Sequence, residues 1–163
     1  MCAHVTTWNK NTSIKFRTEV AMMCKLGFDI KLTDMDERDA TYCHEAVQNY
    51  NRLKPVILDG DLFRLVSPYE GNHTSSMYVS KDQQKAVVFA FDIHPRYAEK
   101  LMPVRLSGLD PNKMYRVNEI NKIQTMPMRA GMPMRPGMSN PLDNKVYSGA
   151  YLMTVGLNLF STR

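Results

Sequence analysis

Hydrophobic residues recur along this chain with two different spacings, and the spacing changes near residues 55–60. In the first third they return every three or four positions, which is the spacing of one helical face. This pattern predicts helices over residues 13–26 and 34–53. Between them, residues 28–32 alternate apolar and polar side chains, which predicts a short strand.

The two predicted helices carry apolar stripes that should face a core. The first stripe consists of Phe16, Val20 and Met23, and the second of Cys43, Ala46, Val47, Tyr50 and Leu53. Side chains three, four and seven positions apart share one side of a helix.

Residues with known end preferences mark where these helices should begin and stop. Thr12 or Ser13 can cap the first helix, and Gly27 can end it because glycine tolerates positive φ. Thr33 followed by Asp36 resembles a capping box for the second helix. Pro55 is expected to end or kink that helix near the preceding lysine.

Beyond residue 60 the chain consists of short runs rich in β-branched and aromatic residues, separated by Gly, Pro, Asn and Asp. The runs cover residues 62–66, 77–79, 86–91, 104–106, 114–120 and 156–160. Short strands at such intervals predict an antiparallel β-sandwich. The predicted fold class is therefore α+β, with two N-terminal helices followed by this sandwich.

The helix–strand–helix order of the first part is typical of a barrel or a wound α/β sheet. Only one strand is predicted there, and one strand cannot form a parallel sheet. We interpret this as a sign that the chain is a truncated portion of something larger.

A methionine-rich segment interrupts the second part. Residues 126–131 are nearly repeated by residues 132–137, and their prolines and glycines exclude a helix or a central strand. We expect a long loop. Its methionines suit Cu(I) binding or an adaptable contact surface, although an expanded loop under little constraint is the simplest interpretation.

Composition and charge exclude several classes of function. The formal net charge is +5, but Lys and Arg are scattered through the 163 residues, unlike the basic stripe of a nucleic-acid-binding protein. No stretch approaches the roughly 20 apolar residues of a membrane span. The three cysteines lack metal-site or disulfide spacing, so we expect no metal and no cofactor.

Few residues are candidates for chemistry. Asp59 and Asp61 flank Gly60, but carboxylates around a glycine are ordinary in turns. The histidines at positions 4, 44, 73 and 94 are far apart and lack the spacing of zinc ligands.

Several strings together resemble the C-terminal part of melibiase-type α-galactosidases, glycoside hydrolase family 36. They lie in the same order over nearly the whole chain, at residues 1–5, 15–23, 26–29, 60–69, 86–90, 104–111, 115–121 and 147–157. Examples are Gly-Asp-Leu-Phe-Arg-Leu from residue 60 and Gly-Leu-Asp-Pro from residue 108.

The resemblance implies a division of the chain at residue 54. Residues 1–54 would be the remnant of a (β/α)8 catalytic barrel, in which residues 1–10 form the loop after strand seven and residues 28–32 form strand eight. Residues 55–163 would be the C-terminal antiparallel β-sandwich.

It also implies retaining hydrolysis of α-galactosides by two opposed carboxylic acids. In the family both aspartates come from earlier barrel strands, so we assign no catalytic residue here. The segment that contains His4 and Trp8 would line the pocket rim, because barrel active sites are built from the loops after the strands. His4 and Trp8 are therefore the candidate substrate-binding residues.

Two functions follow as hypotheses. The first is a C-terminal fragment of an α-galactosidase that lacks both catalytic aspartates, is inactive alone and meets an α-galactoside only within an intact barrel. The alternative is a stand-alone β-sandwich that binds carbohydrate or protein. We expect neither nucleic-acid nor membrane partners. The sequence leaves open whether the chain forms a homo-oligomer. The compartment is unknown, and would be the cytoplasm if Met1 is the true first residue.

Overall fold

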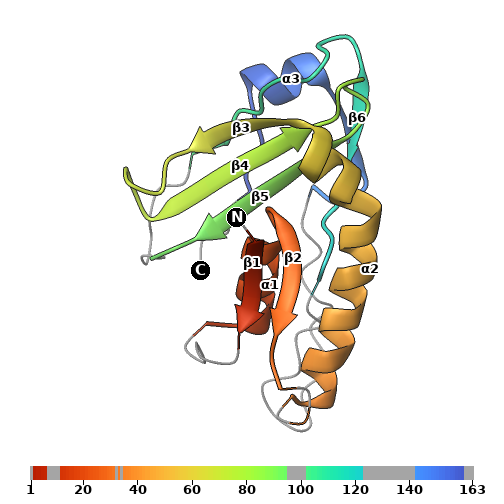
Figure 1. Ribbon diagram of the computed structural model, residues 1–163. Coiled ribbons are helices and arrows are strands. Elements are labelled where there is room, and N and C mark those ends of the chain that lie inside the picture. The colour runs from red at the N-terminus through yellow and green to blue at the C-terminus, as the bar shows by residue number, and fades with distance from the viewer. Residues whose placement is uncertain are drawn as a thin grey trace, which may run out of the picture.

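The computed structural model of the chain describes residues 2–6, 12–31, 33, 35–94, 102–122 and 142–159. In these residues helices and strands alternate at first, and strands dominate afterwards (Figure 1). In chain order the elements are β1 (Cys2–Thr6), α1 (Ile14–Met22), β2 (Lys25–Asp29), α2 (Glu37–Asp59), β3 (Asp61–Val66), β4 (His73–Val79), β5 (Ala86–Asp92), β6 (Met114–Val117), β7 (Lys145–Ser148) and α3 (Gly149–Thr154). The predicted mixture of helices and antiparallel sheet is confirmed.

The N-terminal part holds two strands where the sequence predicted one. β1 and β2 pair in parallel, with Val5 opposite Phe28, and α1 connects them. Strands that point the same way require such a crossover connection. The expectation that residues 1–10 form only a loop is thus wrong for β1. The argument for truncation that rested on a lone strand loses its basis.

Local chemistry explains the ends of α1. The Ser13 hydroxyl accepts a hydrogen bond from the backbone N–H of Phe16 at 3.1 Å, so the predicted cap is confirmed. The helix stops at Met22 rather than at residue 26, because the residues that follow pair with β1. Gly27, predicted as the helix terminator, lies inside β2. β2 therefore begins earlier than the predicted strand.

The second helix is longer than predicted at its C-terminal end. Its N-cap is Asp36, whose Oδ1 accepts from the backbone N–H of Asp39 at 2.7 Å. α2 then continues through Pro55 to Asp59, so the prediction that this proline ends the helix is wrong. Val56 and Ile57, directly after it, are only 5% and 4% exposed. Burying each such side chain contributes about 1.5–3 kcal/mol, which holds the last turn in place.

The stripe predicted for α1 is wrong in part. Val20 is 39% exposed, while Phe16 and Met23 are only half-buried against the core. The buried side chains of α1 are instead those of Ile14, Thr18, Ala21 and Met22. The buried stripe starts at Ile14 and includes Thr18. A search for apolar residues alone misses this polar position.

The stripe of α2 is largely confirmed. Cys43, Ala46 and Tyr50 are buried, and Leu53 packs half-buried against the same cluster. Val47 is 37% exposed and is the exception.

β3, β4 and β5 form an antiparallel sheet with β4 in the centre. The strands predicted at residues 62–66 and 86–91 are confirmed, and residues 77–79 are the end of the longer β4. One face, with Tyr78, Phe89 and Phe91, packs in the same apolar cluster as α1 and α2. This cluster is called the helix-side core below.

The opposite face of the sheet packs against the C-terminal residues. Met77 and Val79 are buried there with Leu106, Leu109 and Leu152. This second cluster is called the C-terminal core below. The central strand β4 is thus covered on both faces, which explains why four of its residues, Ser75, Met77, Tyr78 and Val79, are buried.

The remaining C-terminal elements depart from the predicted strands. β6 ends at Val117 rather than at residue 120, and it pairs antiparallel with β7. Of the strands predicted at residues 104–106 and 156–160, the described part forms one bridge between Val104 and Leu157, and residue 160 lies outside it. The short helix α3, which was not predicted, follows β7 and places Leu152 in the C-terminal core.

Two tyrosines connect the N-terminal elements to each other and to the sheet. The hydroxyl of Tyr50, on α2, donates to the carbonyl of Cys24 at 2.7 Å. The hydroxyl of Tyr78, on β4, donates to the carbonyl of Met23 at 2.5 Å. Both carbonyls belong to the turn between α1 and β2, so these bonds fix that turn relative to α2 and β4.

Candidate ligand-binding cavity

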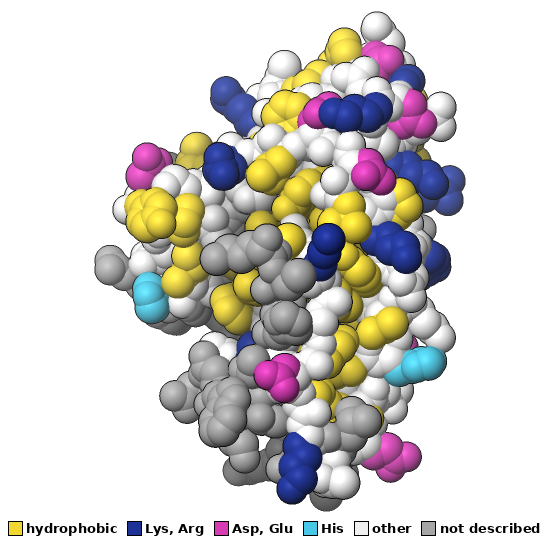
Figure 2. Space-filling view, viewed as in Figure 1, with side chains coloured by type: hydrophobic (Ala, Val, Ile, Leu, Met, Phe, Trp, Pro, Cys, Tyr) yellow, Lys and Arg dark blue, Asp and Glu magenta, His cyan; other side chains and the backbone are white. Residues whose placement is uncertain are grey.

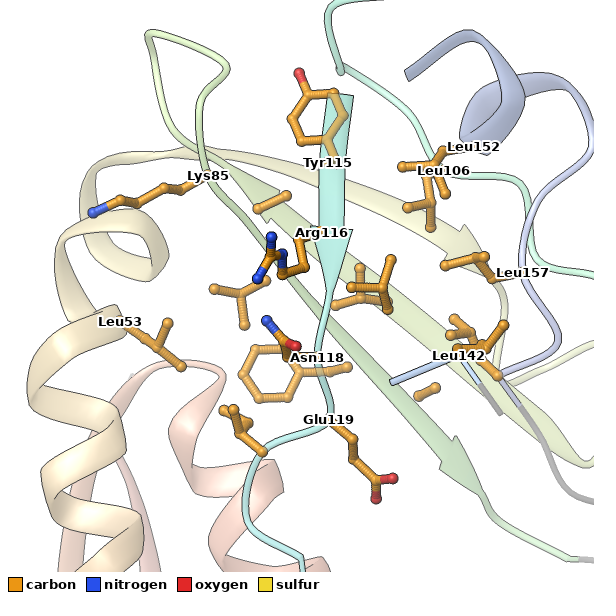
Figure 3. A pocket seen from close by; sticks show the side chains of 18 of the residues that line it. Leu53, Lys85, Leu106, Tyr115, Arg116, Asn118, Glu119, Leu142, Leu152 and Leu157 are labelled. Atoms are coloured by element: carbon orange, nitrogen blue, oxygen red, sulfur yellow. The ribbon is translucent and has the colours of Figure 1, made fainter. Parts of the chain in front are cut away.

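A cavity of about 640 Å³ lies between strands β5 and β6 (Figure 3). Residues 84–91 border it on one side and residues 114–121 on the other. Its volume falls within the range of about 300–1,000 Å³ that is typical of ligand pockets. The hairpin from β4 to β5 and the start of β6 position its two long sides.

Leucines form much of its wall. Leu106, Leu152 and Leu157 from the C-terminal core line one side, and Leu53 on α2 lies across from them (Figure 3). Met22 of α1, which is fully buried, adds to the wall on the helix side. The cavity therefore touches both apolar cores of the molecule.

Charged side chains line the cavity as well, and several are already paired. Lys15 donates to Glu19 at 2.6 Å and to the backbone carbonyl of Asn121 at 2.7 Å. Burial raises the pKa of Glu19, and the nearby Lys15 charge partly offsets this. The Glu19 carboxylate is thus a poorly solvated group that depends on one lysine.

Asp143 is held in a different way. Lys122 donates to one of its oxygens, and the backbone N–H of Glu119 donates to the other at 2.8 Å. The hydrogen bond from Lys122, followed by that from Glu119, lowers the pKa of Asp143. This carboxylate stays ionised and serves as an anchor for the chain after β6.

Asn121 joins the cavity to both N-terminal helices. It is 7% exposed and adopts a positive φ of 54°. Its side-chain oxygen accepts from Asn49 on α2 at 2.6 Å, and its side-chain nitrogen lies 3.3 Å from the sulfur of Met22. Asparagine is one of the few residues that tolerate this backbone conformation.

The arrangement suits binding better than acid–base catalysis. Retaining cleavage of a glycosidic bond needs two carboxyl groups about 5–5.5 Å apart across the sugar. Of the carboxylates that line the cavity, Glu19 is paired with Lys15, Asp143 is paired with Lys122, and Glu119 is exposed. In the described ranges no group of three or more His, Cys, Asp or Glu side chains is arranged to hold a metal ion.

The side chains of both candidate substrate-binding residues lie outside the described residues. His4 lies in β1 opposite Gly27, but its side chain is outside the described residues. Trp8 and the methionine-rich segment at residues 126–138 also lie outside them. The roles suggested for these residues stay predictions.

The other residues singled out from the sequence have structural surroundings. Asp59 ends α2 and Asp61 begins β3, where it pairs with Lys81. His44 is exposed and shares a hydrogen bond of 2.8 Å with Gln48. His73 pairs with Asp92 on the neighbouring strand at 2.7 Å.

Apolar side chains also reach the surface. Figure 2 shows them gathered in a band down the middle of one face, with Lys and Arg mainly toward its edges. Around β6, β7 and α3 the exposed fractions are 64% for Met114, 48% for Val146, 41% for Tyr151 and 49% for Val155. Scattered apolar residues are normal, but a patch of them is typical of a contact surface.

None of the helices within the described residues is long and apolar enough to cross a bilayer.

Residues 73–163 match the glycosyl hydrolase family 36 C-terminal domain. The chain belongs to this family of glycoside hydrolase domains. The resemblance stated from the sequence strings is thereby confirmed.

Curated relatives give the same picture. The chain is 29% identical to alpha-galactosidase 2 of Hypocrea jecorina over 149 residues, which cover 91% of this chain and 17% of the relative. It is 33% identical to the probable alpha-galactosidase C of Aspergillus terreus over 147 residues, which cover 88% of this chain and 16% of the relative. The chain therefore spans about one sixth of the length of these relatives.

A solved structure is similar over the whole chain. The GH36 alpha-galactosidase AgaB from Geobacillus stearothermophilus superposes with a TM-score of 0.78 and 28% identity, covering 100% of this chain and 20% of that protein. AgaA from the same organism gives a TM-score of 0.78 with 27% identity and the same coverage.

Proposed function

We propose that this chain is the C-terminal portion of an α-galactosidase that acts on terminal α-galactosides, and that by itself it cleaves no glycosidic bond. The observation that carries the proposal is the superposition on AgaB, which takes in 100% of this chain and 20% of that enzyme. Such coverage is typical of one part of a larger scaffold. A fifth of an enzyme does not contain the whole of a barrel active site.

Within this proposal, residues 1–54 are the end of a catalytic barrel and residues 55–163 are a β-sandwich. The order β1–α1–β2–α2 with parallel pairing supports the first assignment, because a (β/α)8 barrel repeats that unit. The antiparallel sheets β3–β4–β5 and β6–β7 support the second. The proposed division after residue 54 falls within α2, which continues to Asp59, and β3 begins at Asp61.

The role of the chain is then to support a barrel rather than to supply its acids. The cavity carboxylates Glu19 and Asp143 both accept from lysines, which favours a structural use of their charge. The sheet packs against α1 and α2 through the helix-side core, so it can brace the barrel helices.

The test is an assay of the purified full chain with p-nitrophenyl α-galactoside, run beside AgaA as the positive control. We expect no nitrophenol release above that of buffer. Turnover that follows the chain through two purification steps would overturn the proposal.

A titration with raffinose separates this proposal from the alternative of a free-standing sugar-binding module. AgaA has been crystallised in complex with raffinose in a variant form, which makes this sugar a suitable probe. We expect no amide or side-chain shifts at millimolar raffinose. Shifts clustered on exposed aromatic residues, such as Tyr69 at 96% exposure or Tyr151, would favour the binding module.

A further inference from the structure

We draw no further inference here: the strongest candidate, the leucine-lined cavity between β5 and β6, carries none because nothing in the described part of the chain shows what occupies or covers it.

Discussion

The parallel pair β1–β2 and the antiparallel sheet β3–β4–β5 lie in one chain but are stabilised to different degrees. β4 is paired on both edges and has four buried residues. Among the described residues β2 is paired on one edge only, and none of its side chains is buried. Its Lys25 and Asp29 are exposed, and Leu26 and Phe28 are half-buried.

This difference indicates which part of the chain can be self-sufficient. A two-stranded sheet buries little surface and is marginal without further packing. Parallel sheets normally occur with both faces covered. β1 and β2 thus depend on α1, α2 and the two tyrosine hydrogen bonds, whereas the antiparallel sheet also has the C-terminal core, which is built from residues after position 60.

The sharpest contrast comes from two methionines that are both fully buried, Met77 on β4 and Met22 on α1. Met77→Ala should lower the free energy of unfolding of the antiparallel sheet by about 2–5 kcal/mol, through lost burial and a cavity. Met22→Ala should destabilise β1, α1 and β2 while changing the unfolding of the sheet by less than about 1 kcal/mol. Urea unfolding followed by residue-resolved NMR measures both. Equal losses in one shared transition would show that the two regions unfold as one.

Asn121 is the polar connection between the cavity and the N-terminal helices. Asn121→Ala should destabilise the chain by about 1–3 kcal/mol, because Asn49 loses its acceptor while partly buried and alanine resists the positive φ. Asn144→Ala is the matched control, since Asn144 has a similar φ of 61° but is exposed. Thermal unfolding of both variants gives the difference. Equal destabilisation would mean that only the backbone matters.

Tyr78→Phe removes one hydrogen bond between the sheet and the α1–β2 turn. The expected loss is about 0.5–1.5 kcal/mol, confined to α1, β1 and β2. Burial raises the pKa of this tyrosine, which agrees with a hydroxyl held away from water. Tyr69→Phe, at a side chain 96% exposed, should change nothing. The measurement is amide hydrogen exchange in α1. Unchanged exchange rates there would show that the turn does not connect the sheet to α1.

Glu19 should give the smallest effect, visible as a pH dependence. Its pKa is raised above 4.5 in the folded chain. The folded state therefore holds its proton more tightly, and stability is lost as pH rises from about 4.5 through the folded pKa. Glu19→Gln should remove this loss, because an amide does not titrate in this range. Unfolding curves measured from pH 4 to pH 8 test this pH dependence. If the free energy of unfolding falls with pH equally in the variant and the unmodified chain, Glu19 is not the cause.

Much of the antiparallel part could be predicted from the sequence, because it depends on local patterns. β3 and β5 are short runs of β-branched and aromatic residues between turn residues, and they appear as predicted. β1 was missed because Val5 and Thr6 are the strand formers in Cys-Ala-His-Val-Thr, too few for a recognisable pattern, and its stability comes from pairing with residues 25–29. Pro55 misled the prediction of α2 because the burial of Val56 and Ile57 outweighs a local penalty.

The cavity could not be predicted, since its two sides are residues 84–91 and 114–121. Their separation depends on how two sheets are placed, and no local pattern encodes that. Asn121 gave no signal either, because a lone asparagine after a strand is ordinary turn chemistry. The family resemblance, by contrast, was readable because it lies in ordered strings rather than in contacts.

We propose that the antiparallel part is self-sufficient, while residues 1–54 belong to a larger barrel. Amide hydrogen exchange of the monomeric chain tests it most directly. We predict that buried amides of β4 exchange only through global unfolding, and that amides of β1 and α1 exchange at least about tenfold faster through local opening. Equally slow exchange across α1, α2 and β4 in a monomer would contradict the account.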